Sequence, residues 1–173
     1  MKAKVPLLVA TALIAWALKR HYSDARVDDL WWMLAPTAQL VGVTTGATFA
    51  MQPGEGYFSR DHLFLIEKSC AGINFMIAAF GMLVFTLFRR VGTTISAATV
   101  LVVCVLASYA AAVVVNAVRI AIAMWLAARP AVLPTFSAAD VHRLEGIVVY
   151  FAGLVLLYEL AQRLDRRASV AMS

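Results

Sequence analysis

The sequence contains few charged residues, and no part of it differs enough in composition to indicate a second domain. Only 14% of its 173 residues are charged, whereas 62% are hydrophobic and the mean hydropathy is +0.82. This composition excludes an ordinary soluble domain, which needs more polar surface. Internal repeats and low-complexity tracts are also absent from the sequence. The chain is therefore predicted to be all-α, a polytopic membrane helix bundle that forms a single integral-membrane domain over residues 1–173.

Cysteine is also scarce, and the three histidines and two cysteines show no short metal-site spacing. Cys70 and Cys104 are expected at different depths, so we predict two free thiols. We also expect no metal and no cofactor. A redox or metal-binding subunit that uses His62, His142 and Cys70 is an alternative, although nothing in their spacing favours it.

The net charge of +5 does not indicate a nucleic-acid partner, because the basic residues form short clusters between apolar runs. Five runs are near or above the length that a membrane span needs, except for the shorter first one. They are Val5 to Leu18, Leu30 to Met51, Ala71 to Phe88, Ile95 to about Leu126 or Ala128, and Leu144 to Leu160. The first run resembles a signal peptide, but a retained helix fits the predicted topology better. We expect about five transmembrane helices in a lipid bilayer.

Lysine and arginine residues indicate the orientation, because cytoplasmic loops are enriched in them. If five spans alternate, the tightest basic clusters fall on one side. The residues on this predicted cytoplasmic side are Lys19, Arg20, Arg26, Arg89, Arg90, Arg163, Arg166 and Arg167. The residues on the opposite side are Lys2, Lys4, Arg60, Lys68, Arg129 and Arg143. We therefore expect the N-terminus outside, and the loops at 52–69 and 129–141 on the exterior.

Cys70 lies at the predicted outer boundary of the third span, with Glu67 at i−3 and Asn74 at i+4. On a helix these three polar side chains would share one face, which lipid would not tolerate. Helical rise places Cys70 about 28 Å above Arg89, and His142 about 31 Å above Arg163, so the thiol and the imidazole share a level. Cys104 has only apolar sequence neighbours and is expected to be a packing residue.

Arg119 lies inside a long apolar run, with Asn116 at i−3. A buried arginine is costly in a membrane unless it faces a polar cavity or a partner, and the alternative is a side chain that extends to the lipid headgroups. Helical rise places Arg119 about 40 Å beyond Gly92, roughly 10 Å higher than Cys70. The two side chains therefore meet only if the span tilts or the arginine reaches down.

His142 opens the fifth span and has Gly146 one turn later, where a neighbouring backbone could approach closely. A thiolate is a nucleophile, an imidazole can move its proton, and a guanidinium can stabilise an oxyanion. Cys70, His142 and Arg119 thus suggest acyl transfer through a thioester. His62, eight residues before Cys70, competes with His142 for the role of base.

These residues resemble the exosortase/archaeosortase family of membrane enzymes. Its pattern is Glu, Cys and Gly near one span, Asn-x-x-Arg near the next, and His with a following Gly. The matching segments are EKSCAG, NAVR and HRLEG. Their order and intervals match from about Glu67 to the end of the fifth run. The first two runs carry no matching motif and the chain is short, so it looks like a compact member, similar to exosortase K.

The resemblance implies a membrane cysteine protease or transpeptidase of the inner or cytoplasmic membrane, with its active site facing the exterior or periplasm. The implied partner is the C-terminal sorting signal of an exported protein: a short motif, a transmembrane helix and a basic tail, similar to PEP-CTERM signals. Transfer to a cell-surface acceptor would follow. The candidate catalytic residues are Cys70, Arg119 and His142, and the supporting residues are Glu67, Gly72, Asn74, Asn116 and Gly146. A non-catalytic membrane scaffold is the alternative function.

Overall fold

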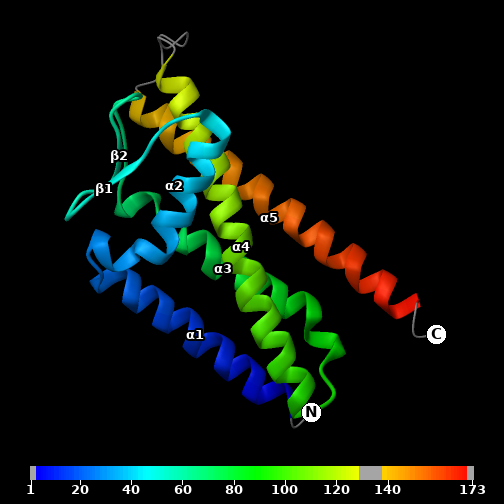
Figure 1. The fold of residues 1–173 in the computed structure, drawn as a ribbon. Helices are drawn as coiled ribbons and strands as arrows, with labels where there is room; N and C mark the ends of the chain where they lie inside the picture. The colour runs from blue at the N-terminus through cyan, green and yellow to red at the C-terminus, as the bar shows by residue number, and fades with distance from the viewer. Residues whose placement is uncertain (1–2, 129–137, 171–173) are drawn as a thin grey trace. The chain divides into compact units, whose positions relative to one another are not determined.

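The computed structural model describes residues 3–128 and 138–170, apart from the side chains at 138–142 and 168–170. The described part is mostly helical and has a small antiparallel sheet (Figure 1). The α-helices are α1 Lys4–Asp24, α2 Trp31–Thr45, α3 Ile73–Leu87, α4 Thr94–Ala127 and α5 Ala138–Val170. The short 3-10 helices are η1 Val27–Leu30, η2 Lys68–Cys70 and η3 Phe88–Arg90, and the strands are β1 Ala50–Gln52, β2 Gly56–Ser59 and β3 Phe64–Ile66.

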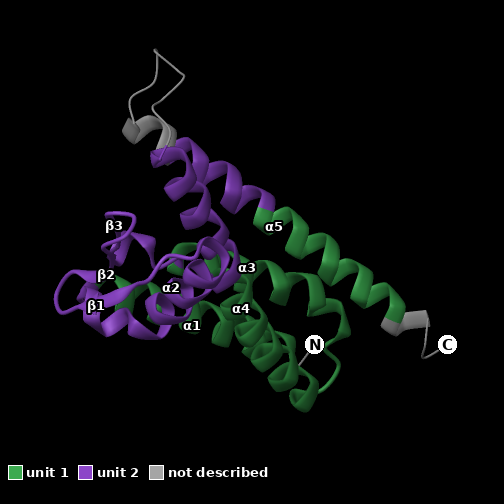
Figure 2. Ribbon diagram, turned by 45° about the horizontal axis from the view of Figure 1, so that its top comes forward, with its two compact units in different colours: residues 1–23, 73–112, 153–173 green, residues 24–72, 113–152 purple. Residues whose placement is uncertain are grey.

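The chain divides into two compact units (Figure 2). Unit 1 comprises residues 1–23, 73–112 and 153–173, and unit 2 comprises residues 24–72 and 113–152. Both α4 and α5 pass from one unit to the other. Every residue of the candidate site discussed below except Asn74 belongs to unit 2.

Three helical segments in the described part are long and apolar enough to cross a membrane. They are Lys68–Arg90, Thr94–Ala127 and Arg143–Arg167. Many large apolar side chains on these segments are exposed, as expected where lipid rather than protein covers a helix. Examples on α4 and α5 are Val102, Val103, Leu106, Leu144, Ile147, Val148, Phe151 and Leu156. These features indicate a multi-pass membrane protein.

Within unit 1, α1 runs antiparallel to α3, which contradicts the predicted order of crossings. The Lys4 ammonium lies 5.0 Å from the centre of the Phe88 ring. Near the other end of α1, the Lys19 ammonium donates a hydrogen bond to Asn74 Oδ1 at 2.9 Å. Five alternating spans would make α1 and α3 parallel. If both α1 and α3 cross the membrane, the segment between them does not cross it once, as the five-span topology requires.

The apolar run at 30–51 is not one long helix, which explains this difference. α2 has 15 residues, about 22 Å of helix, and the hydrocarbon core of a bilayer is about 30 Å thick. Thr45 donates its hydroxyl to the Val41 carbonyl at 2.7 Å, and Gly46 then adopts a positive φ of 76°. A left-handed glycine at this position ends a helix, so the remaining apolar residues leave α2 and enter β1.

The three-stranded sheet also corrects the all-α prediction. β2 is central and pairs with both neighbours, with Met51 opposite Tyr57 and Tyr57 opposite Ile66. Strands of three or four residues are too short to produce a clear alternating pattern in the sequence. The predicted exterior loop at 52–69 therefore contains β2 and β3 and is an ordered part of unit 2.

Polar contacts attach this sheet to the segment before α2. Both carboxylate oxygens of Asp28 accept the Gly54 N–H at 3.0 Å, and the Lys68 ammonium donates to the Ala25 carbonyl at 2.6 Å. The Thr48 hydroxyl donates to the exposed Asp61 carboxylate and holds the pKa of Asp61 below its usual value. The Lys68 contact is only two residues from Cys70, so it helps to hold the start of the site.

The core of unit 1 is apolar and contains Cys104, whose side chain is 1% exposed. The buried residues that pack in this cluster are Ala3, Leu7, Phe80, Leu83, Val84, Val91, Ala97 and Cys104. Both cysteines are free thiols, as predicted. Cys104 is a packing residue, as its apolar sequence neighbours indicate.

Candidate functional site

Cys70 lies at the end of the short 3-10 turn η2, before α3 begins at Ile73. Its N–H donates to the Glu67 carbonyl at 2.9 Å, and its carbonyl accepts the side-chain amide of Asn116. The Cys70 side chain is 5% exposed, and the Asn116 side chain is completely buried. Both backbone hydrogen-bonding groups of Cys70 are therefore engaged, so the turn holds the thiol in a defined place.

Gly72 allows the chain to turn from Cys70 into α3. Its φ is +68°, a conformation that residues with a Cβ rarely adopt. A Cβ at this position would also lie 3.2 Å from the Cβ and Cγ atoms of Asn116. The glycine thus lets the turn approach Asn116 closely enough for the amide to reach the Cys70 carbonyl.

We expect Gly72→Ala to lower the free energy of unfolding by about 1 to 3 kcal/mol, because alanine is strained at positive φ. It should also displace Asn116 and slow alkylation of Cys70. Thermal melting and mass spectrometry of the detergent-purified protein measure the two effects. The control is Gly92→Ala, since a Cβ on Gly92 meets no atom within 4 Å. Equal melting temperatures for the two variants would contradict the described packing.

The guanidinium of Arg119 contacts the sulfur of Cys70, with Nη2 and Sγ 3.6 Å apart. Arg119 is only 9% exposed, so it does not extend to the lipid headgroups. The sequence-based estimate placed Arg119 roughly 10 Å higher than Cys70, but in the structure the guanidinium and the sulfur are in contact. That estimate assumed a continuous helix from Cys70, whereas η2 and Gly72 interrupt it. A guanidinium in this position can donate hydrogen bonds to negative charge that develops in a reaction at the sulfur.

Residues of α5 surround the same guanidinium. The Tyr150 ring centre lies 5.3 Å from the central carbon of Arg119, and the Tyr150 hydroxyl donates to Asn116 Oδ1 at 2.9 Å. The Glu145 carboxylate interacts with the Arg119 charge. Gly146 is buried, and a Cβ there would lie 3.3 Å from Arg119 Nη1. The absence of a side chain at Gly146 therefore lets α5 approach the arginine.

The predicted helical face of Glu67, Cys70 and Asn74 does not form, because η2 and Gly72 interrupt the helix. Asn74 is exposed in unit 1, where it accepts the hydrogen bond from Lys19 described above. Glu67 is also exposed, and its carboxylate accepts the Ser69 hydroxyl at 2.7 Å. The Ser69 oxygen in turn lies 3.8 Å from Cys70 Sγ. Glu67 is thus linked to the thiol through a serine.

The histidines are only partly placed. Position 142 belongs to α5, one turn before Gly146, but the His142 side chain lies outside the described part. His62 is exposed in the turn between β2 and β3, beside Asp61. Among the residues that the structure describes, no group of three His, Cys, Asp or Glu side chains could hold a metal ion.

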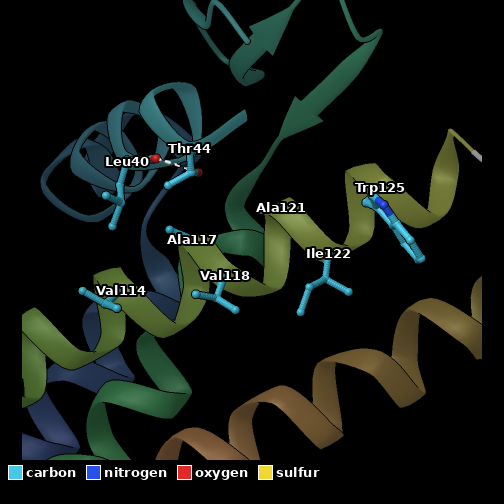
Figure 3. A pocket seen from close by; sticks show the side chains of 8 residues that line it. All are labelled: Leu40, Thr44, Val114, Ala117, Val118, Ala121, Ile122 and Trp125. Carbon is cyan, nitrogen blue, oxygen red and sulfur yellow. Dashed lines mark hydrogen bonds between the residues drawn. The ribbon is translucent and has the colours of Figure 1, made fainter. Parts of the chain in front are cut away.

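Unit 2 also contains an apolar pocket of about 560 Å³ between α2 and α4 (Figure 3). Its lining residues are Leu40, Thr44, Val114, Ala117, Val118, Ala121, Ile122 and Trp125. The Thr44 hydroxyl is bonded to the Leu40 carbonyl at 2.9 Å, so the lining presents little free polar surface. Ala117 and Val118 lie between Asn116 and Arg119 in the sequence, so one stretch of α4 serves both the pocket and the polar site.

Sequence reasoning missed Tyr150 and Ser69, and did not connect Glu145 with Arg119. The sequence does contain a signal for Tyr150: it follows His142 and Gly146 at intervals of four, and residues four apart occupy one helix face. No comparable signal marks Ser69, whose contacts depend on the geometry of the turn.

Comparison with protein-family models, curated proteins and solved structures finds no match to this chain. The geometry of the site and the motif resemblance are therefore the basis for the proposal that follows.

Proposed function

We propose that the protein is a membrane-embedded cysteine peptidase or transpeptidase in which Cys70 is the nucleophile. The observation that carries this proposal is the 3.6 Å contact between Arg119 Nη2 and Cys70 Sγ in a buried site. A packing cysteine needs no cation at its sulfur, and Cys104 has only apolar neighbours in its core cluster. The guanidinium and the fixed turn are features of an activated thiol.

In the proposed reaction the Cys70 thiolate attacks a peptide carbonyl carbon of the substrate. The Arg119 guanidinium stabilises the resulting oxyanion by charge and hydrogen bonding. The carbon–nitrogen bond then breaks, and the leaving amine takes a proton from His142, a role assigned from the resemblance. Water or an acceptor amine finally cleaves the thioester and returns the Cys70 thiol.

The substrate class follows from the motif resemblance to the exosortase/archaeosortase family. We propose an exported protein whose C-terminus has a short motif, a transmembrane helix and a basic tail. A substrate anchored in this way would present its scissile bond at the membrane boundary. Cys70 lies shortly before the apolar helix α3, which begins at Ile73, so a nucleophile in that position suits such a substrate.

We also propose four membrane crossings, by α1, α3, α4 and α5, with both ends of the chain in the cytoplasm. The cytoplasmic end would be the end of unit 1 where Lys4 lies beside Phe88 and Arg90 pairs with Asp165. Basic residues there greatly outnumber acidic ones, which suits the anionic cytoplasmic leaflet. α1 is about 31 Å long, which is sufficient for a crossing. Cys70 would then face the exterior.

The topology predicts which introduced cysteines react with a membrane-impermeant maleimide in intact cells. In a chain with both native cysteines replaced by alanine, Glu55→Cys should react directly, because Glu55 lies in the turn between β1 and β2. Arg89→Cys should react only after permeabilisation. An N-terminal green fluorescent protein fusion should fluoresce, since it would stay in the cytoplasm. An exterior N-terminus would contradict four crossings.

The direct test of the function is processing of a co-expressed protein from the same organism that ends in such a sorting signal. The proposal predicts a shortened product that depends on this chain. A signal that stays intact beside the wild-type chain would count against the peptidase and leave the scaffold alternative.

A further inference from the structure

We propose that Tyr150 is a positioning residue for the site, and that its hydroxyl and its ring have separate tasks. The hydroxyl orients Asn116, which holds the Cys70 turn, and the ring supports the Arg119 guanidinium. This inference rests on the proposed role of Cys70 as a nucleophile. Tyr150 belongs to α5, so the helix that carries position 142 would also control the geometry around the thiol.

The first task follows from the chemistry of an amide side chain. The oxygen and nitrogen ends of asparagine have similar shapes, so only hydrogen-bond partners decide which end points where. The Tyr150 hydroxyl donates to Asn116 Oδ1 at 2.9 Å, and Asn116 Nδ2 donates to the Cys70 carbonyl. Since Asn116 is completely buried, water cannot replace either partner. Because the Cys70 carbonyl can only accept, it takes the Nδ2 end of the amide, and the Tyr150 hydroxyl then anchors the Oδ1 end and holds Asn116 against the Cys70 turn.

The second task concerns a buried charge. The Arg119 side chain is 9% exposed, and its Nε atom has no hydrogen-bond partner among the described residues. The face of an aromatic ring attracts a guanidinium, most strongly where water is excluded. With its centre 5.3 Å from the guanidinium carbon, the Tyr150 ring partly compensates the buried cation. It also limits movement of Arg119 away from Cys70 Sγ.

The test is the rate at which iodoacetamide alkylates Cys70 in the full-length protein in detergent at neutral pH. Mass spectrometry of the Cys70 peptide gives the rate without any substrate. We compare Tyr150→Phe, which keeps the ring, with Tyr150→Leu, which removes it. The control is Tyr158→Phe on the same helix, because its hydroxyl also has a side-chain hydrogen bond, from Gln162, but Tyr158 is 39% exposed.

We expect Tyr150→Phe to slow alkylation about threefold to tenfold, the usual effect of losing one buried hydrogen bond. Tyr150→Leu should slow it further, and Tyr158→Phe should react like the wild type. The effect of Tyr150→Phe should disappear in an Asn116→Ala background, because the hydroxyl acts through that amide. A tyrosine that merely fills space would lower the melting temperature without this dependence on Asn116.

Two results would overturn the inference. One is a wild-type alkylation rate in Tyr150→Phe, and the other is an undiminished effect in the Asn116→Ala background. If Tyr150→Phe alone does not fold, the alkylation rate of Asn116→Ala is compared with that of the double variant Asn116→Ala/Tyr150→Phe. The inference predicts equal rates, and a difference of more than about threefold between them would overturn it. Processing of a sorting signal tests the proposed function separately, since alkylation needs no substrate.

Discussion

Cys70→Ala should abolish processing of the sorting signal, with activity falling by a factor on the order of 10⁴ or more. Alanine removes the sulfur that would form the proposed thioester and leaves the backbone of the turn unchanged. The substitution should barely affect folding, because the N–H and the carbonyl of Cys70 make the hydrogen bonds at this position. The measurement is immunoblotting of the co-expressed substrate, with the amount of enzyme in the membrane determined in parallel.

The matched control is Cys104→Ala, which removes the second thiol from the apolar core of unit 1. It should lose some stability, as a core substitution does, while processing continues. A non-catalytic scaffold predicts a different pair of results, since neither thiol would be needed. Processing that continues in Cys70→Ala would therefore remove Cys70 as the nucleophile.

Arg119→Lys should lower processing by about 10²-fold to 10³-fold, the usual effect of losing an oxyanion donor. Lysine keeps a positive charge near Glu145 but cannot present a planar guanidinium to both Cys70 Sγ and the Tyr150 ring. The loss should therefore appear in the rate of processing more than in stability. Turnover of purified substrate and melting temperature measure the two quantities.

Arg119→Ala should be worse in both respects, because it also leaves the Glu145 carboxylate without the cation beside it. Arg89→Lys provides the control, since Arg89 is an exposed arginine in η3. Near-normal turnover in Arg119→Lys would mean that the guanidinium does not stabilise the transition state. Arg119 would then be a structural partner of Glu145 and Tyr150.

Sequence patterns predicted the polar centre better than the topology. Cys70, Asn116, Arg119 and Gly146 come from segments far apart in the chain, yet the structure places them in contact around one sulfur and one guanidinium. Polar residues inside apolar runs are informative because lipid forces them to find partners.

The predicted span at 30–51 was wrong, whereas the orientation of the chain stays a prediction. The basic cluster at Lys19 and Arg20 is as dense as the one at Arg89 and Arg90. Charge alone therefore could not decide which of the two clusters lies on the cytoplasmic side. The run at 30–51 contains no charged residue, but Gly46 ends the helix after 15 residues. The amino-acid composition shows that this run is hydrophobic, but it does not show where the backbone changes direction.

The most direct test of the account is to find the acyl group on the enzyme. The full-length protein is mixed with its substrate in detergent, quenched with acid and measured by intact mass. The account predicts an added mass on Cys70 equal to the substrate segment before the cleaved bond, which neutral hydroxylamine removes and which is missing from Cys70→Ala. Substrate cleavage with no such adduct in the wild type, or an equal adduct in Cys70→Ala, would contradict a thioester on Cys70.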